Sequence, residues 1–210
     1  TARGAVIGAS GNHPFYVLRD DRKPGRQRAR YRAQWAQAED LRVGDLVGIA
    51  TDLPEFGRSA PLLVPERVGA DVFPRVTSPE LCWWAGLYIG DGYLHNRGRF
   101  VSVEIAVDAQ DRALVDEIVR VTRELFGIEM TLASDRSRLC GRGTAALAEF
   151  VQLNGLGGNA HTKRIPEWVF GLPRDERLSF VAGYVDADGY VRDHVKNRVV
   201  VLSSANRPLL

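Results

Sequence analysis

Two stretches of the chain place a carboxylate at the same point of a repeated pattern. The first runs from Trp84 to Gly92 (WAGLYIGDG) and the second from Val181 to Gly189 (VAGYVDADG). Each is an apolar segment with Ala-Gly near its middle and Asp-Gly at its end. The last turns of the two predicted helices therefore carry an aspartate, at positions 91 and 188. A helix C-terminus carries a partial negative charge and favours cations, so a carboxylate there is unfavourable unless a positive group lies beside it.

The small residues of the repeat indicate what brings the two helices together. Gly86 and Gly90 are four residues apart, as are Gly183 and Ala187. Small residues at this spacing let two helix backbones approach closely, and one such motif alone indicates a simple helix-packing pair.

Close packing of the pair would bring two carboxylates together at two negative helix ends, where they repel. A divalent metal bound between the carboxylates turns this repulsion into a net attraction. Mg²⁺ prefers one or two carboxylates together with phosphate oxygens and water. Carboxylates, metal and phosphate together indicate hydrolysis of a phosphodiester by in-line attack of water.

Composition restricts the class of protein. The 210 residues are 45% hydrophobic and 26% charged with a formal net charge of +2, so a general polycation is excluded. A local basic run from Arg19 to Arg32 would suit either a phosphate backbone or a solvated loop. Cys82 and Cys140 form neither a disulfide framework nor a metal site by spacing, which predicts a reducing, cytoplasmic setting. No stretch approaches the roughly 18 apolar residues of a membrane helix, so no membrane partner is expected.

The periodicity predicts a β-rich front segment followed by a mixed helix and strand region. Short apolar runs flank a turn signal at Ser10–Pro14, which indicates a compact all-β unit within residues 1–50. Ser78-Pro79-Glu80 has the hydroxyl, proline and acid of a helix start. Beyond this helix, the pattern leaves room for a strand between residues 94 and 99 and predicts a strand at 99–107 and two short strands within 128–139. It also predicts helices at 108–126 and 144–153, a second motif helix at 174–188, a strand at 195–203 and a helix beginning at 206.

The two repeated segments resemble the paired LAGLIDADG motif of homing endonucleases. The second copy is close to the consensus, whereas the first has Ile89 and Gly90 in place of its first Asp and Ala. The resemblance implies that Asp91 and Asp188 are the catalytic, metal-ligating acids and that Mg²⁺ is the cofactor. It also implies a monomer with two pseudo-symmetric αββαββα repeats, whose sheets form a saddle over double-stranded DNA.

Further site residues follow from the same resemblance. The segment from His161 to Pro166 (HTKRIP) is similar to the lysine and Ile-Pro that precede the second motif in intein-borne members, which implies a catalytic role for Lys163 on the attacking water or the phosphate. A surface lysine is the alternative. Four basic residues beside the first strand after each motif helix are candidate DNA contacts, to guanine edges or to phosphate: Arg97, Arg99, Lys196 and Arg198.

The front segment resembles the splicing (Hint) domain of inteins. Ser10 to Phe15 (SGNHPF) is similar to the Thr-x-x-His block, with Ser10 at the Thr position, and Leu41 to Val47 is similar to the strand that follows. His13 would then act on the scissile peptide at the upstream splice junction. A hairpin turn with a solvent-facing histidine is the alternative.

Together these patterns predict an α+β intein fragment. Residues 1–52 are expected to be part of the all-β Hint domain, 53–78 a proline-rich linker, 79–164 the first LAGLIDADG repeat and 165–210 a truncated second repeat. The chain begins at Thr1 and lacks a splicing nucleophile and a closing His-Asn pair, so we expect it to be inactive on its own. The expected partners are DNA and the flanking host exteins, with a similarity to SufB-type inteins. The alternatives are a non-cleaving DNA-binding module and a purely structural helix-pair domain.

Overall fold

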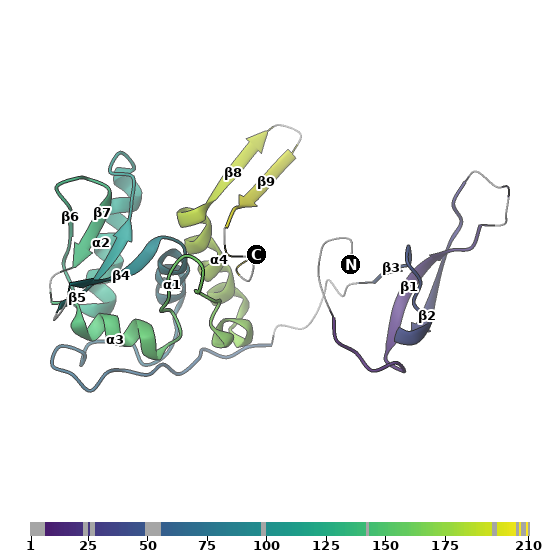
Figure 1. Ribbon diagram of the computed structural model, residues 1–210, viewed down its shortest axis with the longest axis horizontal. Coiled ribbons are helices and arrows are strands. Elements are labelled where there is room, and N and C mark those ends of the chain that lie inside the picture. The colour runs from purple at the N-terminus through teal and green to yellow at the C-terminus, as the bar shows by residue number, and fades with distance from the viewer. Residues whose placement is uncertain are drawn as a thin grey trace. The chain divides into compact units, whose positions relative to one another are not determined.

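The computed structural model describes residues 7–22, 25, 28–48, 56–97, 100–141, 143–194, 197–204, 206 and 209, without the side chains of 96, 97, 100, 193, 194, 197 and 198. The chain divides into two compact units, Thr1–Pro54 and Glu55–Leu210 (Figure 1), which are described separately.

The first unit is a small antiparallel sheet with the strand order β2-β1-β3. Its strands are β1 (Pro14–Asp20), β2 (Tyr31–Gln37) and β3 (Leu46–Val47), with a short 3₁₀ helix, η1 (Ala38–Asp40), after β2. The turn before β1 is closed by a hydrogen bond from the His13 amide to the Ser10 carbonyl at 2.9 Å. Val17 is fully buried while Trp35 is 69% exposed, so this unit buries little apolar surface within itself. The apolar run before the turn, residues 5–8, falls partly outside the described residues, and its described part, Ile7 and Gly8, has no regular secondary structure.

Two neighbouring helices form the centre of the second unit. These are α1 (Pro79–Asp91) and α4 (Arg174–Asp188), which lie side by side in Figure 1. The sequence signal for the start of α1 is confirmed, because the Leu81 amide donates to the Ser78 hydroxyl at 3.2 Å and Pro79 occupies the first turn. Both helices end at an Asp-Gly step, so Asp91 and Asp188 are their last residues.

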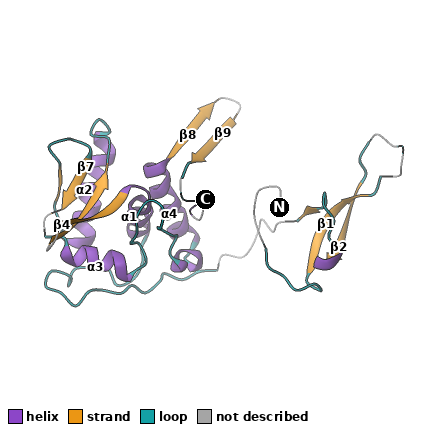
Figure 2. Ribbon diagram, in the orientation of Figure 1, coloured by secondary structure: helices purple, strands orange, loops and turns teal. Residues whose placement is uncertain are grey.

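A four-stranded antiparallel sheet packs beside α1, in the order β4-β5-β7-β6. The strands are drawn in orange in Figure 2. Its strands are β4 (Gly92–Arg97), β5 (Phe100–Ala106), β6 (Met130–Leu132) and β7 (Arg138–Gly141). The remaining helical elements of this unit are α2 (Arg112–Phe126), α3 (Ala145–Leu153) and the 3₁₀ helix η2 (Glu167–Gly171). From α1 to α3 the order is helix, two strands, helix, two strands, helix, as the resemblance implies.

Aromatic side chains fill the core between these elements. Trp84 and Tyr88 of α1 stack at 5.2 Å between ring centroids, and Phe126 of α2 meets Trp84 edge-on at 4.8 Å. Phe73 and Phe150 extend the cluster toward α3. Caps fix both ends of helix α2. At its start the Leu114 amide donates to the Asp111 carboxylate, and at its end Gly127 adopts the left-handed conformation with φ of 64°.

The segment expected to be a linker is packed into the second unit. Residues 56–78 include an isolated antiparallel bridge between Pro61 and Val76, and they bury Leu62, Ala70 and Phe73 against the core. Prolines prevent regular helix or strand here, but the apolar residues between them contact the helices. Among the described residues, no helix combines the length and the hydropathy that a membrane crossing requires.

The internal repeat extends beyond the helices into the strands. After α4 come β8 (Gly189–His194) and β9 (Asn197–Leu202), which pair antiparallel. Gly92 pairs with Ile105 in the first hairpin, and Gly189 pairs with Leu202 in the second. Each residue of the second pair follows its equivalent in the first by the same number of positions that separates Asp188 from Asp91. Strand β4 was anticipated only as room for a strand between residues 94 and 99, and β8 was not predicted, because their polar residues obscure the alternation.

Candidate active site

The site lies where α1 and α4 end side by side, and glycines set how closely the helices approach. A Cβ added to Gly86 would lie 1.9 Å from the carbonyl oxygen of Phe180, and a Cβ added to Gly183 would lie 1.9 Å from that of Trp83. A Cβ on Gly90 would lie 2.4 Å from the Cβ of Ala187. Backbone therefore packs on backbone along the pair, as the spacing of small residues predicts.

This packing brings Asp91 and Asp188 to one point. A Cβ on Gly90, the residue before Asp91, would lie 3.5 Å from Oδ2 of Asp188. Burial, and then repulsion by Asp188, raise the pKa of Asp91 to about 6, although Lys163 opposes the rise. Burial likewise raises the pKa of Asp188, against the influence of Lys163 and Tyr184. Two partly buried carboxylates thus share a site in which the charge of Asp188 makes ionisation of Asp91 harder.

Lys163 lies at the same place and is 2% exposed. Its ammonium donates to the carbonyl oxygens of Tyr88 at 2.7 Å, Ile89 at 2.9 Å and Gly92, all at the C-terminal end of α1. Burial lowers the pKa of Lys163 to about 8, while Asp91 and Asp188 raise it. An ammonium has three donors, so all of them are engaged by the helix end.

Lys163 changes the interpretation of the helix tips. The sequence analysis attributed the tolerance of two terminal aspartates to a metal, yet the end of α1 already receives a positive charge from the chain itself. One ammonium faces two carboxylates, so the site still has an excess of negative charge if both are ionised. The lysine was found through the resemblance, but its contacts with α1 join residues 71 to 75 positions apart and have no local sequence signal.

The donor set discriminates between metals. Among the described residues, no three His, Cys, Asp or Glu side chains gather in a way that could hold an ion. A structural Zn²⁺ site with four protein ligands is therefore not supported. Two carboxylates, with the remaining positions taken by water and phosphate oxygens, fit Mg²⁺, which keeps several waters when it binds proteins. Asp91 and Asp188 would hold it.

Tyr184 is a buried polar residue of the site that the sequence analysis missed. It lies one turn before Asp188 on α4 and is 5% exposed. Its hydroxyl interacts with Ser204 and Asp188 but forms a hydrogen bond of normal geometry with neither. The residue stands within the apolar part of the motif, where an aromatic ring is read as core packing, so the sequence carried no signal for it.

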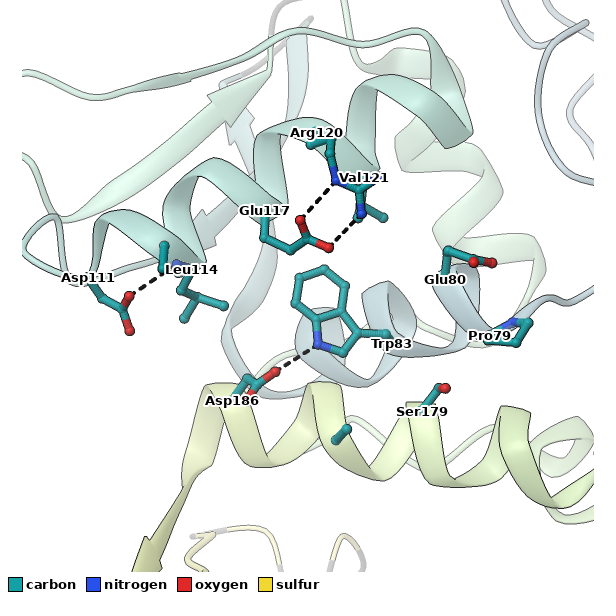
Figure 3. A pocket seen from close by; sticks show the side chains of 12 residues that line it. Pro79, Glu80, Trp83, Asp111, Leu114, Glu117, Arg120, Val121, Ser179 and Asp186 are labelled. Atoms are coloured by element: carbon teal, nitrogen blue, oxygen red, sulfur yellow. Dashed lines mark hydrogen bonds and ion pairs between the residues drawn. The ribbon is translucent and has the colours of Figure 1, made fainter.

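The first Asp of the second motif has a different role from the last. Trp83 of α1 donates its indole N–H to Oδ2 of Asp186 at 2.7 Å, a bond that joins the two helices (Figure 3). Both residues line a groove of about 620 Å³ between α1, α2 and α4, to which neither Asp91 nor Asp188 contributes. The groove carries several carboxylates, with Arg120 as its basic residue, so its charge disfavours nucleic acid.

Two of the remaining predicted residues lie on strands of the second unit. Arg97 lies at the end of β4, paired with Phe100, and Arg198 lies in β9, paired with Asp193. Arg99 and Lys196 fall outside the described residues. His13 belongs to the first unit, where its exposed ring meets Phe15 edge-on at 5.2 Å between centroids.

A model of the LAGLIDADG-like domain family matches residues 78–151 and 175–210 of the chain. The chain is 31% identical to an iron–sulfur cluster assembly SufBD family protein of Mycobacterium leprae, over 99% of the chain and 24% of that protein. It is 28% identical to a replication factor C small subunit of Methanocaldococcus jannaschii, over 84% of the chain and 8% of that protein. It is also 25% identical to a DNA polymerase II large subunit of Thermococcus kodakarensis, over 60% of the chain and 7% of that protein. The chain thus spans a quarter or less of each relative.

Proposed function

Because the chain belongs to the LAGLIDADG-like domain family, which typically consists of nucleases that act on DNA, we propose that it is part of a site-specific homing endonuclease that hydrolyses double-stranded DNA with Mg²⁺. The observation that carries this proposal is the pair of carboxylates, Asp91 and Asp188, held together at the ends of α1 and α4 with raised pKa values. A purely structural helix pair gains nothing from this arrangement, because the carboxylates repel and sit at negative helix ends.

The residues of the site have separate tasks in this proposal. Bound Mg²⁺ would stabilise the developing charge on the phosphate and favour the attacking hydroxide. Asp91 and Asp188 supply the negative charge that attracts the cation, and their fixed helices set the direction of the oxygens. Lys163 holds the end of α1 through the three carbonyls and adds a positive charge near the place where the phosphate would lie.

A nicking assay on the full-length protein with supercoiled plasmid carrying the target and Mg²⁺ tests the proposal. Asp91→Asn and Asp188→Asn remove the charge with little change in volume, and each should reduce cleavage by at least about 100-fold because charge stabilisation in the transition state is lost. Asp186→Asn is the matched control, since an amide oxygen can still accept from Trp83. Cleavage that survives both charge-removing substitutions would refute the catalytic assignment.

The alternative function is a DNA-binding module that does not cleave. The full engagement of the Lys163 ammonium favours it, because this group has no donor left for an attacking water. The same assay separates the two functions. A module would bind DNA with Mg²⁺ present yet leave the plasmid supercoiled, and Asp91→Asn would bind as tightly as the wild type.

We also propose that the endonuclease lies within a protein-splicing element, in which His13 acts at the upstream junction. The relatives support this, because three proteins with unrelated names each contain a segment similar to this chain that occupies a quarter or less of their length. An insertion into different hosts explains that distribution. In the full-length protein, His13→Ala should abolish release of the spliced host protein on a denaturing gel, and unchanged release would refute the role.

A further inference from the structure

The hydroxyl of Tyr184 is a buried polar group beside the paired aspartates. Tyr184 lies one turn before Asp188 on α4, and 5% of the residue is exposed. Among the described residues, no atom forms a hydrogen bond of normal geometry with this hydroxyl. A buried hydroxyl that lacks a partner costs free energy, so each such group in a native structure calls for an explanation. A contact that forms only when the site binds its ligand would provide one.

Helix packing places the Tyr184 ring and the Asp188 carboxylate on the same side of α4. A Cβ added to Gly90 of α1 would lie 3.5 Å from Cδ2 of Tyr184 and 3.5 Å from Oδ2 of Asp188. Both side chains therefore face α1 at the residue that precedes Asp91. The Tyr184 hydroxyl also opposes the rise that burial causes in the pKa of Asp188, which is the effect of a donor directed at a carboxylate.

Two residues after β9, Ser204 and Asn206, set the direction in which the hydroxyl can donate. The Asn206 amide donates to the Ser204 hydroxyl at 3.0 Å, and the buried Asn206 side chain donates to the carbonyl oxygen of Lys163 at 2.7 Å. Because Oγ of Ser204 accepts from the backbone, its own hydrogen is left to donate to the Tyr184 oxygen, with which it interacts. The phenolic hydrogen of Tyr184 is then left for Asp188.

Packing of the helix pair does not require this hydroxyl. The position equivalent to Tyr184 in the first motif is Leu87, which is 1% exposed. A Cβ added to Gly86 would lie 3.0 Å from the amide nitrogen of Tyr184, and a Cβ added to Gly183 would lie 2.9 Å from that of Leu87. The two residues therefore occupy equivalent places in the helix contact, and an apolar side chain fills one of them. The oxygen in the other place is better explained by the acid beside it.

We propose that Tyr184 is a positioning residue for the cation, whose hydroxyl donates to the Asp188 carboxylate and fixes the direction of the oxygen that binds the metal. This inference rests on the proposed function, because it assumes that Asp91 and Asp188 bind a divalent cation. Carboxylates that ligate a metal are themselves hydrogen-bonded, and loss of such an outer partner typically lowers metal affinity or activity by roughly 10–100-fold. The two acids are then served by different groups, with Lys163 at the end of α1 and Tyr184 at Asp188.

Tyr184→Phe in the full-length protein tests the inference, because it removes one oxygen and keeps the ring. Titration of Mn²⁺ followed by electron paramagnetic resonance measures the affinity of the site without DNA or turnover. We expect the affinity to fall by roughly 10-fold relative to the wild type. Without metal, the variant should unfold at a temperature equal to or above that of the wild type, because a buried hydroxyl without a partner has been removed.

Tyr190→Phe is the matched control, since it makes the same chemical change away from the helix ends. Tyr190 lies on β8 and is 51% exposed, and its hydroxyl accepts from Arg192 at 3.3 Å. This variant should bind Mn²⁺ as tightly as the wild type. An equal fall in affinity for the two variants would overturn the inference.

The remaining outcomes separate the inference from the proposed function. If the wild type binds no Mn²⁺, or if Asp188→Asn binds it unchanged, the proposed function fails and the inference fails with it. If the wild type binds Mn²⁺ through Asp188 and Tyr184→Phe binds it as tightly, the inference alone is overturned. A lower affinity together with a lower unfolding temperature in the absence of metal would show that the hydroxyl serves packing, and would also overturn the inference.

Discussion

At the scale of single residues, Lys163 explains how two aspartates are accommodated at abutting helix ends. Its ammonium completes the hydrogen bonds of the last carbonyls of α1 and offsets one of the two negative charges. The aspartate pair could be predicted from the sequence because the same motif, with an aspartate at its end, occurs twice. The contacts of Lys163 could not, since they depend on the register of distant segments.

Lys163→Met tests the role of the ammonium in stability. The substitution keeps an unbranched side chain but leaves three carbonyls without a donor, which should lower the free energy of unfolding by about 2–5 kcal/mol. Urea denaturation followed by circular dichroism measures the change. Arg123→Met is the control on an exposed position and should stay within about 0.5 kcal/mol. A loss for Lys163→Met no larger than the control would contradict the role of the lysine as a helix cap.

The raised pKa of Asp91 predicts a pH dependence of stability. In the folded state the pKa of Asp91 is about 6, above its usual value of 3.8, so the folded protein binds more protons than the unfolded chain between these two pH values. The stabilising contribution of Asp91 to the free energy of unfolding is therefore fully present below about pH 4 and is lost as the pH rises to about 6. Asp91→Asn removes this loss and should be more stable than the wild type at pH 7, by roughly 1–3 kcal/mol.

Urea midpoints of both proteins from pH 4 to pH 7 measure the effect. The difference between variant and wild type should grow across this range. A constant difference would show that Asp91 has an ordinary pKa, and Mg²⁺ should reduce the difference by stabilising the wild type alone.

At the scale of elements, the pairing of α1 with α4 depends on glycines that no side chain can replace. The helix ends, the amphipathic α2 and most of the strands were predicted because caps and periodicity are local signals. The packing of residues 56–78 into the core was not predicted, because prolines indicate irregular backbone and say nothing about burial. Strand β8 was missed for the related reason that its alternation is interrupted by polar residues.

Gly183→Ala tests the helix contact. Its new Cβ would lie 1.9 Å from the Trp83 carbonyl, so α1 and α4 must separate and Asp91 and Asp188 must move apart. We expect a loss of stability of at least about 2 kcal/mol in spite of the better helix propensity of alanine. Gly171→Ala, where no atom lies within 4 Å of the new Cβ, is the matched control and should be near neutral. Equal thermal midpoints for the two variants would refute close packing at Gly183.

At the scale of the whole molecule, the two repeats differ in how they are covered. Trp84 is fully buried under α2, and its indole donates to Thr122 at 2.9 Å. Val181 occupies the equivalent position on α4 and is 48% exposed, because no element among the described residues covers it. Val191 on β8 and Val200 on β9, which pair with each other, are also exposed.

This asymmetry predicts unequal costs for equivalent substitutions. Trp84→Ala should destabilise the chain by about 3–5 kcal/mol, because it opens a cavity beneath α2. Val181→Ala should cost under about 0.5 kcal/mol, since its side chain is half exposed. Thermal unfolding of the two variants measures the difference. Similar losses would show that the surface around Val181 is covered in solution.

The central claim is that Asp91 and Asp188 bind one divalent cation between the ends of two helices. Titration of Mn²⁺, a spectroscopic substitute for Mg²⁺, followed by electron paramagnetic resonance measures this directly, without dependence on DNA or on turnover. We expect one site per chain, with affinity reduced at least about 10-fold in Asp91→Asn and in Asp188→Asn but unchanged in Asp186→Asn. Equal binding by all four proteins, or none by the wild type, would contradict the account.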